Sequence, residues 1–178
     1  KGDIVQVDTN NVFYLEANSS YANTTIRFFE LIPFAEEMND YAIEFDMMIP
    51  EKNRANAFLI SLRSNLKLND AYATEYRCYM DFGDNTISIE HSSPTADREA
   101  LSETGDINGK IPKTIQENTW YHHRVEINGE QINWYIDNIL MLRAQDSRLQ
   151  SGLPMFTVSH VPISGYYYID NILIESLE

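Results

Sequence analysis

Polar and aromatic residues that could bind a sugar recur on one phase of several alternating segments. Successive side chains of a strand point to opposite faces, so the apolar phase belongs to a core and the other phase to the outside. The outward phase collects Ser61, Arg63, Arg77, Tyr79, Asp81, Ser88 and Glu90 and, further along, Thr157 and Ser159. Aromatic rings stack on pyranose rings, while carboxylates and guanidinium groups bind their hydroxyls. We expect a glycan-binding set on one concave sheet face; the alternative is an ordinary solvated face with cross-strand ion pairs.

The segments that must position these residues alternate with a period of two, and helical periodicity is nearly absent. Residues 41–49 alternate most regularly, and Pro50 ends that segment because it lacks a backbone donor. The other predicted strands are 12–15, 25–29, 57–63, 75–82, 86–90, 121–127, 131–141, 155–160 and 166–175. Residues 92–118 are polar and predict a long surface excursion, with little regular structure beyond a helical turn near 96–101.

The last third of the chain carries the strongest fold signal. Two alternating segments meet at Asn128-Gly129, which is typical of a two-residue hairpin. The pentapeptide Ile-Asp-Asn-Ile-Leu occurs at 136–140 and again at 169–173, and we expect this final strand to lie in the middle of a sheet. Because no βαβ unit is visible, the sequence predicts an all-β fold, an antiparallel β-sandwich or jelly roll, with residues 1–178 as one domain.

The charge of the chain excludes several classes of partner. Twenty-seven acidic residues against thirteen basic ones give a net charge of −14, which repels phosphate backbones and anionic membrane surfaces. No apolar run approaches the roughly 18 residues of a membrane span. The single cysteine, Cys78, precludes an internal disulfide and is interpreted as a buried apolar residue. We therefore expect no nucleic-acid partner and no membrane insertion.

Three stretches together resemble a known superfamily. They are residues 40–46 (Asp-Tyr-Ala-Ile-Glu-Phe-Asp), residues 120–137 from Trp-Tyr-His-His through Trp-Tyr-Ile-Asp, and the closing residues 165–174. In this order they resemble the concanavalin A-like lectin/glucanase superfamily, in its laminin-G-like branch, over roughly residues 10–177. The resemblance implies a sandwich whose last strand pairs near the first. It does not choose a function, because this fold carries lectins, glycan-binding modules, glycosidases, lyases and adhesion domains.

The same resemblance raises the question of catalysis. In the β-glucanase members the catalytic strand reads Glu-x-Asp-x-Glu or Glu-x-Asp-x-x-Glu, and retaining glycosidases need two carboxyl groups about 5 Å apart. Here Glu44-Phe-Asp46 is followed by two methionines and an isoleucine, so the second glutamate is missing. We interpret Glu44 and Asp46 as acids on a solvated strand face. His122 and His123 should point to opposite faces of a regular strand, which argues against a zinc site.

Only the resemblance suggests a calcium site. In several glycan-binding sandwiches of this kind an Asp at the start of the last strand ligates a structural Ca²⁺, together with oxygens from the N-terminal segment. Asp170 matches that position, and Asp8, Glu16 and Asn18 could add oxygen ligands, of which calcium takes six to eight. The alternative is that Asp170 is a plain hydrogen-bonding residue.

The aromatic residues outside the polar set divide between core and surface. Trp134 alternates with isoleucines, so we predict that it packs in the core, and we expect the same of Trp120. Three consecutive tyrosines, residues 166–168, must split between faces, which leaves Tyr167 or a neighbour exposed near the sandwich edge.

Three functions fit these observations. The leading hypothesis is a non-catalytic carbohydrate-binding module of an exported bacterial polysaccharide-handling protein, located outside the cell, at its surface or in the periplasm. It would bind an oligo- or polysaccharide mainly through Arg63, Arg77, Tyr79 and Glu90. The second is a glycoside hydrolase of laminin-G-like type using acids such as Glu75, Asp81 and Glu90, and the third is a protein-binding adhesion domain. No signal peptide is visible, and the absence of an initial methionine suggests a trimmed sequence.

Overall fold

The computed structural model describes residues 2–7, 10–17, 24–27, 38–50, 56–65, 74–81, 86–101, 109–110, 115–160 and 165–177. It places side chains in 38–50, 58–65, 74–81, 86–95, 99–101, 115–155 and 167–177. The strands are β1 (Gly2–Val7), β2 (Asn10–Ala17), β3 (Thr24–Arg27), β4 (Tyr41–Met48), β5 (Asn56–Ser64), β6 (Glu75–Asp81), β7 (Thr86–Ser93), β8 (Ala96–Ala100), β9 (Gly109–Lys110), β10 (Trp120–Asn128), β11 (Gln131–Ile136), β12 (Ile139–Gln145), β13 (Leu153–His160) and β14 (Gly165–Ser176). None of the described residues forms a helix that could cross a membrane.

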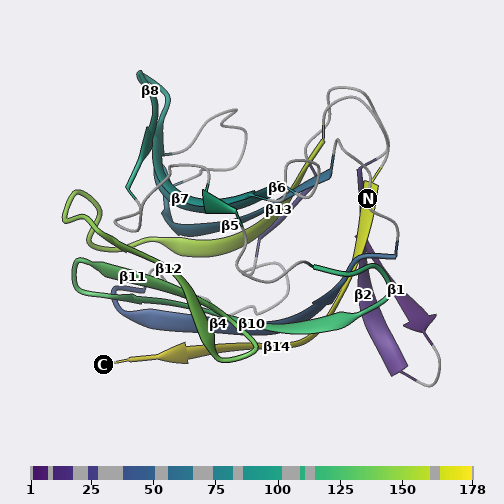
Figure 1. The fold of residues 1–178 in the computed structure, drawn as a ribbon. Coiled ribbons are helices and arrows are strands. Elements are labelled where there is room, and N and C mark those ends of the chain that lie inside the picture. Colours follow the sequence, from purple (N-terminus) through teal and green to yellow (C-terminus); the bar gives the residue numbers. More distant parts are fainter. Residues whose placement is uncertain are drawn as a thin grey trace.

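The strands build two antiparallel sheets that lie face to face (Figure 1). Sheet A has the order β1-β2-β14-β4-β10-β11-β12. Sheet B has the order β3-β13-β5-β6-β7-β8, and β9 pairs with β7. The two layers confirm the predicted antiparallel sandwich, because each sheet buries one apolar face against the other.

The closing strand lies where its apolar composition predicts. β14 pairs with β2 on one side and with β4 on the other, so it is an interior strand of sheet A. Its pairing with β2 also returns the end of the chain close to the first strands, as the resemblance implied. A strand covered on both edges and on one face can carry the long apolar run that residues 165–174 show.

The hairpin predicted at Asn128-Gly129 exists, but its turn begins one residue later. Asn128 pairs with Gln131, so the two turn residues are Gly129 and Glu130. Gly129 has a φ of 55°, the left-handed value that glycine adopts without steric cost. The turn is followed by β11, whose alternating isoleucines and Trp134 point into the core.

Part of the stretch predicted as a surface excursion is regular structure. Residues 96–100 form strand β8 rather than a helical turn, so that prediction was wrong. β8 follows β7 through a tight turn at residues 94–95, and Leu101 donates a backbone hydrogen bond of 2.8 Å to the carbonyl of Ile89. Pro94 cannot continue the ladder of a strand, which accounts for the turn at this point.

The space between the sheets holds one apolar core. Its buried members include Tyr41, Ile43, Phe45, Met47, Phe58, Ile60, Tyr76, Cys78, Met80, Ile87, Ile89, Val125, Ile127, Ile132, Trp134, Ile136, Tyr167 and Ile169. The core placements predicted for Trp134 and Cys78 are therefore confirmed. One aromatic prediction was wrong: Trp120 is 38% exposed, because the inward phase of β10 begins at Tyr121. The consecutive tyrosines split between faces as expected: Tyr167 is fully buried, with its ring centroid 5.6 Å from that of Phe58, and Tyr168 is partly exposed.

Candidate functional site

The outer face of sheet B is concave in its backbone and carries most of the polar residues selected from the sequence. In Figure 1 this sheet is bent, with β8 rising on one side and the ends of β5 and β13 on the other. We name the polar residues of its outer face the concave-face cluster: Glu75, Arg77, Tyr79, Asp81, Ser88 and Glu90. The pairing of β6 with β7 places Arg77 opposite Glu90 and Tyr79 opposite Ser88. The hairpin pairing assumed from the sequence is thus present, and it gathers these side chains on one face.

Hydrogen bonds run along each strand of the cluster. Arg77 Nε donates to Glu75 Oε1 at 2.6 Å, and Ser64 Oγ donates to Glu75 Oε2 at 2.9 Å. Tyr79 donates its hydroxyl to Asp81 over 3.3 Å, and Ser88 donates to Glu90 Oε1 over 2.8 Å. Side chains two apart on a strand share a face, which is why Arg77, Tyr79 and Ser88 each reach an acid of their own strand. Ser64 reaches Glu75 from the neighbouring strand β5.

Two members of the cluster retain unused hydrogen-bonding capacity. Glu90 Oε2 is shielded from solvent and accepts no hydrogen bond in the part of the chain that the structure describes. Arg77 is bonded there only through Nε, which leaves both terminal nitrogens of its guanidinium as donors. A buried carboxylate oxygen without a donor costs on the order of 1–3 kcal/mol, and the terminal nitrogens of Arg77 are the donors of this cluster that a ligand could use.

Arg63 does not belong to this face, and its predicted position was wrong. Leu153 pairs with Ser64 and Met155 with Ser61, so β5 carries one extra residue at this point, a β-bulge. Arg63 has a φ of 46°, and its side chain is only 1% exposed, turned between the sheets. Its guanidinium donates to the carbonyls of Asn39, Gly129 and Leu149 at 2.6–2.9 Å and forms an ion pair of 2.9 Å with Asp40. Arg63 joins the two sheets at one end of the sandwich, and the bulge returns Ser64 to the concave face.

Two further predicted members lie on β13. Thr157 pairs with Leu59 of β5, and Ser159 pairs with residue 57 of the same strand. By register this puts Thr157 on the rung of Tyr79 and Ser88, since Leu59 also pairs with Tyr79. The side chains of Thr157 and Ser159 lie outside the described ones, so their part in the site stays a prediction.

Asp170, the residue predicted to hold calcium, makes one hydrogen bond among the described residues. Asp170 Oδ1 accepts the backbone N–H of Asn171 at 2.8 Å. The acid that pairs with it on β4, Asp46, is bonded to His122 Nδ1 at 2.9 Å and to the amide of Asn171 at 2.6 Å. No group of three or more His, Cys, Asp or Glu residues suited to a metal ion occurs among the described residues. Asp8, the other predicted metal ligand, falls outside them.

The outer face of sheet A is the solvated polar face that the sequence predicted for Glu44 and Asp46. Arg124 of β10 bridges Glu44, Glu126 and Glu175, at 2.7 Å for the last two. Burial opposes its charge, but these hydrogen bonds prevail and raise the pKa of Arg124. His122 and His123 point to opposite faces, as predicted: His123 is fully buried, with its ring stacked 4.9 Å from that of Phe45. Burial lowers the pKa of His123 to about 3, so it is neutral.

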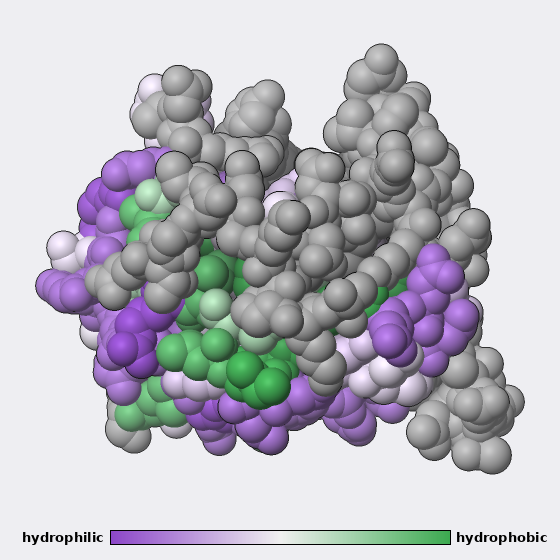
Figure 2. Space-filling view, viewed as in Figure 1, coloured by the Kyte–Doolittle hydropathy of each residue, from purple (hydrophilic) through white to green (hydrophobic). Residues whose placement is uncertain are grey.

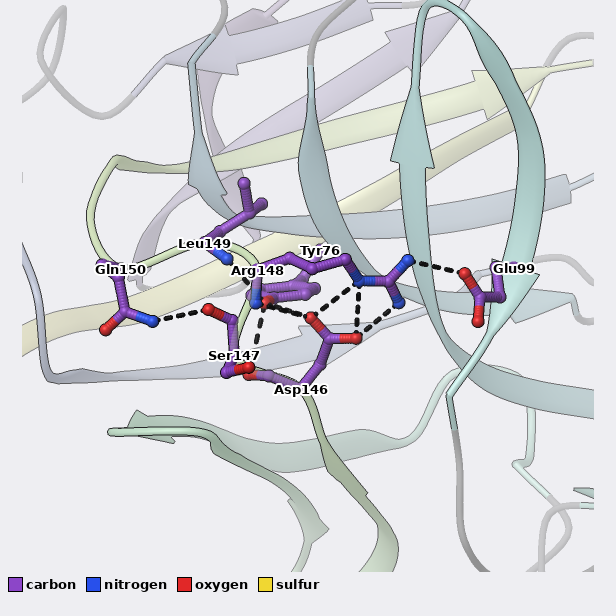
Figure 3. A network of polar contacts seen from close by, with 7 residues as sticks. All are labelled: Tyr76, Glu99, Asp146, Ser147, Arg148, Leu149 and Gln150. Atoms are coloured by element: carbon purple, nitrogen blue, oxygen red, sulfur yellow. Dashed lines mark hydrogen bonds and ion pairs between the residues drawn. The ribbon is translucent and has the colours of Figure 1, made fainter.

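A polar network not predicted from the sequence fixes the connection between β12 and β13 against sheet B (Figure 3). Tyr76 donates its hydroxyl to Asp146 Oδ1 at 2.7 Å and accepts the N–H of Leu149 at 3.0 Å. Arg148 bonds Asp146 and reaches Glu99 at 2.6 Å. Burial raises the pKa of Asp146, but the bonds from Arg148 and Tyr76 outweigh it and lower the pKa to about 2. The only signal for this network in the sequence is the close spacing of Asp146 and Arg148. Their partners Tyr76 and Glu99 are remote in the sequence, so their contacts depend on the fold.

Large exposed apolar side chains are confined, among the described residues, to sheet A: Trp120, Ile139, Leu140 and Leu173. Figure 2 shows hydrophobic surface over the β11–β12 hairpin, bordered by hydrophilic surface. On the outer face, Leu173 and Leu140 lie at the two ends of one rung, separated by Glu44, Arg124 and Tyr135. An ion pair thus interrupts this apolar surface.

Comparison with solved structures places the fold among carbohydrate-active proteins. A carbohydrate-binding module, CBM66 from Bacillus subtilis, superposes with a TM-score of 0.68 and 19% identity over 99% of this chain and 92% of that one. A family 16 glycoside hydrolase from Bacteroides ovatus, in complex with a mixed-linkage glucan product, gives 0.69 and 10% identity over 98% and 85%. A family 7 alginate lyase, A1-II′, gives 0.62 and 9% identity over 95% and 81%.

These likenesses establish the architecture: an antiparallel jelly-roll sandwich, in agreement with the resemblance to the concanavalin A-like superfamily at the level of fold. No family model and no curated protein matches the chain. Sequence identities of 9–19% support a shared fold and no shared function, because the same sandwich architecture occurs in binding modules, hydrolases and lyases. The function must therefore be argued from the site.

Proposed function

We propose that this chain is a carbohydrate-binding module that holds an oligo- or polysaccharide on the concave face of sheet B. The observation that carries the proposal is the concave-face cluster itself, in which Arg77 and Glu90 sit opposite each other with unused hydrogen-bonding capacity. Sugar hydroxyl groups accept hydrogen bonds, so a bound sugar can accept from the terminal nitrogens of Arg77. Tyr79, on the next rung, offers an aromatic ring beside them.

The contacts of Glu75 favour binding over catalysis. Glycosidases use a pair of carboxyl groups, one of which exchanges a proton with the glycosidic oxygen. Glu75 is 4% exposed, and both its oxygens are occupied, one by Arg77 and one by Ser64. A carboxylate held in this way orients Arg77 and has no free oxygen to offer a substrate. The hydrolase alternative is left with Asp81 and Glu90, which lie on different rungs of neighbouring strands.

The proposal is tested by a glycan-array screen of the purified chain, followed by titration calorimetry on the glycans that bind. Arg77→Ala and Tyr79→Ala should each weaken binding about tenfold or more, the effect of losing a charge-assisted hydrogen bond or a stacking ring. Arg143→Ala is the matched control, since Arg143 is exposed on sheet A. If all three variants bind the glycan with equal affinity, the outer face of sheet B is not the binding site. If reducing ends are released from a bound glycan, and Asp81→Asn or Glu90→Gln abolishes this release, the chain is a hydrolase and the proposal of a non-catalytic module is wrong.

The cellular setting and the metal follow as parts of the same proposal. We place the chain in an exported bacterial protein that handles polysaccharide, outside the cell or in the periplasm. Its acidic surface suits a polar ligand and provides no attraction for phosphate backbones. A structural Ca²⁺ at Asp170 and Asp8 would raise the thermal unfolding midpoint in calcium over that in chelator. The same midpoint in both solutions would remove the metal from the proposal.

A further inference from the structure

We propose that the outer face of sheet A carries a second carbohydrate-binding site, built around Trp120 and His122; this inference rests on the proposed function only in that the chain binds glycans. Both residues belong to β10 and point away from sheet B. Trp120 is 38% exposed, and so is the side chain of His122. Side chains two apart on a strand lie about 7 Å from each other on one face. The site is separate from the concave-face cluster, because the core lies between the two sheets.

Trp120 belongs to an apolar rung of three strands. It pairs with Met48 of β4, and Met48 pairs with Tyr168 of β14. Met48 is 8% exposed and Tyr168 is partly exposed, so the rung places two aromatic side chains on either side of a nearly buried methionine. The two aromatic residues are two strands apart, which is about 10 Å. This span is longer than one sugar ring, so the rung suits a chain of sugars.

The neighbouring rung holds His122 in a fixed orientation. Asn171 Nδ2 donates to Asp46 Oδ2 at 2.6 Å, and Asp46 Oδ1 lies 2.9 Å from His122 Nδ1. A carboxylate only accepts hydrogen bonds, so Nδ1 carries the proton and Nε2 of the neutral ring is an acceptor. Nε2 lies 3.8 Å from Glu44 Oε2, beyond hydrogen-bonding distance. His122 is therefore an oriented, half-exposed acceptor on the same face as the Trp120 ring.

This arrangement fits a glycan better than a protein partner. A sugar ring stacks its apolar face on an aromatic side chain, and its hydroxyl groups donate to an acceptor such as Nε2 of His122. Stable protein interfaces bury about 800 Å² on each partner around an apolar centre. Here the rung next to Trp120 is polar, and the one after it carries the ion pair of Glu44 and Arg124. The apolar surface around Trp120 is thus limited to one rung.

Tryptophan fluorescence follows this site directly, because Trp134, the other tryptophan, is fully buried. Each glycan that binds on the array is titrated into the chain, and the quenching of Trp120 by acrylamide is measured. At least one glycan should protect Trp120 from quenching, and it should do so equally in Arg77→Ala. The ligand concentration needed for protection should rise about tenfold in His122→Ala. Leu140→Ala is the matched control, since Leu140 is 40% exposed on the same outer face, and it should leave the protection unchanged.

Calorimetry supplies the second readout, because Trp120→Ala removes the fluorescent ring. Glycans that protect Trp120 in the wild type should bind this variant about tenfold more weakly, through loss of the stacking ring. Trp120→Phe keeps an aromatic ring and should restore most of the affinity. The thermal unfolding midpoints of these variants should equal that of the wild type within the effect of an exposed substitution.

The possible results separate this site from the concave-face cluster. If no glycan protects Trp120 while Arg77→Ala weakens binding, the second site is wrong and the proposed function stands. If a glycan protects Trp120 and Arg77→Ala binds every glycan as the wild type does, the second site stands and the concave face is not the binding site. Protection that is the same in His122→Ala would overturn the role given to that residue.

Two further outcomes would overturn the inference. If Trp120→Ala abolishes a concentration-dependent dimer and no glycan protects Trp120, the residue contacts a second copy of this chain. Binding to no glycan at all would overturn the inference together with the proposed function.

Discussion

Replacing Arg63 by methionine tests the physical account of how the two sheets are joined. The guanidinium is almost completely buried and contacts Asp40 and three backbone carbonyls. Methionine fills a similar volume but donates no hydrogen bond, so Arg63→Met removes the donors and leaves their acceptors in place. The backbone of Arg63 also donates to the hydroxyl of Tyr41 at 2.7 Å, and that bond survives the substitution.

The expected loss of stability follows from the groups that would remain unpaired. Removing one partner of a buried ion pair costs about 3–5 kcal/mol. Asp40 keeps 28% exposure and also accepts the N–H of Gly129 at 2.8 Å, so water and that bond compensate part of its charge. The three carbonyls lose the donors that the guanidinium supplied. We expect a decrease of about 3 kcal/mol in the free energy of unfolding, a large share of the 5–15 kcal/mol typical of a domain.

Urea denaturation followed by tryptophan fluorescence measures this loss, because Trp134 is fully buried in the same sandwich. Arg143→Met is the control: Arg143 is exposed, with one hydrogen bond of 3.1 Å to Asn133, and its loss should cost below about 0.5 kcal/mol. If Arg63→Met does not fold, Asp40→Asn still tests the ion pair, since an amide oxygen retains both hydrogen bonds but not the charge. A cost for Arg63→Met similar to that of the control would refute the inter-sheet role of Arg63.

Three further predictions concern stability. His123 is buried with a pKa of about 3 against 6.5 for an unperturbed histidine, so the free energy of unfolding should fall as pH drops from 6.5 towards 3, by at most about 1.4 kcal/mol per pH unit from this residue. In His123→Phe the urea midpoint should vary less with pH across that range. If the slope of midpoint against pH is the same as in the wild type, His123 is not the residue responsible. Asp146, whose pKa is lowered to about 2 from 3.8, stabilises the fold above pH 3.8 and loses this effect as pH falls through 2. Asp146→Asn should therefore lower the free energy of unfolding by about 1–2 kcal/mol at pH 7 and leave it unchanged near pH 2. Chemical denaturation of the variant and the wild type at both pH values measures this difference. At Gly152, φ is 151° and an added Cβ would lie 2.4 Å from the carbonyl carbon of Arg63, so Gly152→Ala should lower the thermal midpoint by the equivalent of more than about 1 kcal/mol; a midpoint equal to that of the wild type would show that this contact relaxes freely.

The period-two pattern predicted most of what a single strand decides for itself. Residues 41–49 alternate inward and outward as expected, with Tyr41 and Phe45 in the core and Glu44 and Asp46 on the solvated face. The same holds for Arg77, Tyr79 and Asp81 on β6. Alternation is a steric property of an extended chain, and it needs no knowledge of the partner strands. The cluster proposed to bind glycans was therefore largely accessible to sequence analysis.

The pattern was insufficient where a strand departs from regular pairing. The pentapeptide at 136–140 forms a hairpin turn, with Asp137 at a φ of 50° and Asn138 at 62°. Its copy at 169–173 stays within β14 as a bulge, with Asn171 alone at 52°. The first copy has β12 to pair with β11, whereas the second lies in a strand paired on both sides by β2 and β4. Identical local sequence therefore adopts the conformation that its neighbours stabilise.

By itself, the sequence determined the all-β class, the positions of most strands, the interior place of the final strand and the face to which regular strand residues belong. Only the tertiary structure decided that the bulge in β5 turns Arg63 inward, that Trp120 is exposed, and that Tyr76 and Asp146 meet across the sandwich. The reason is the range of the forces involved. Alternation is set within a few residues by backbone geometry, whereas bulges and inter-sheet contacts depend on strands that are distant in the chain.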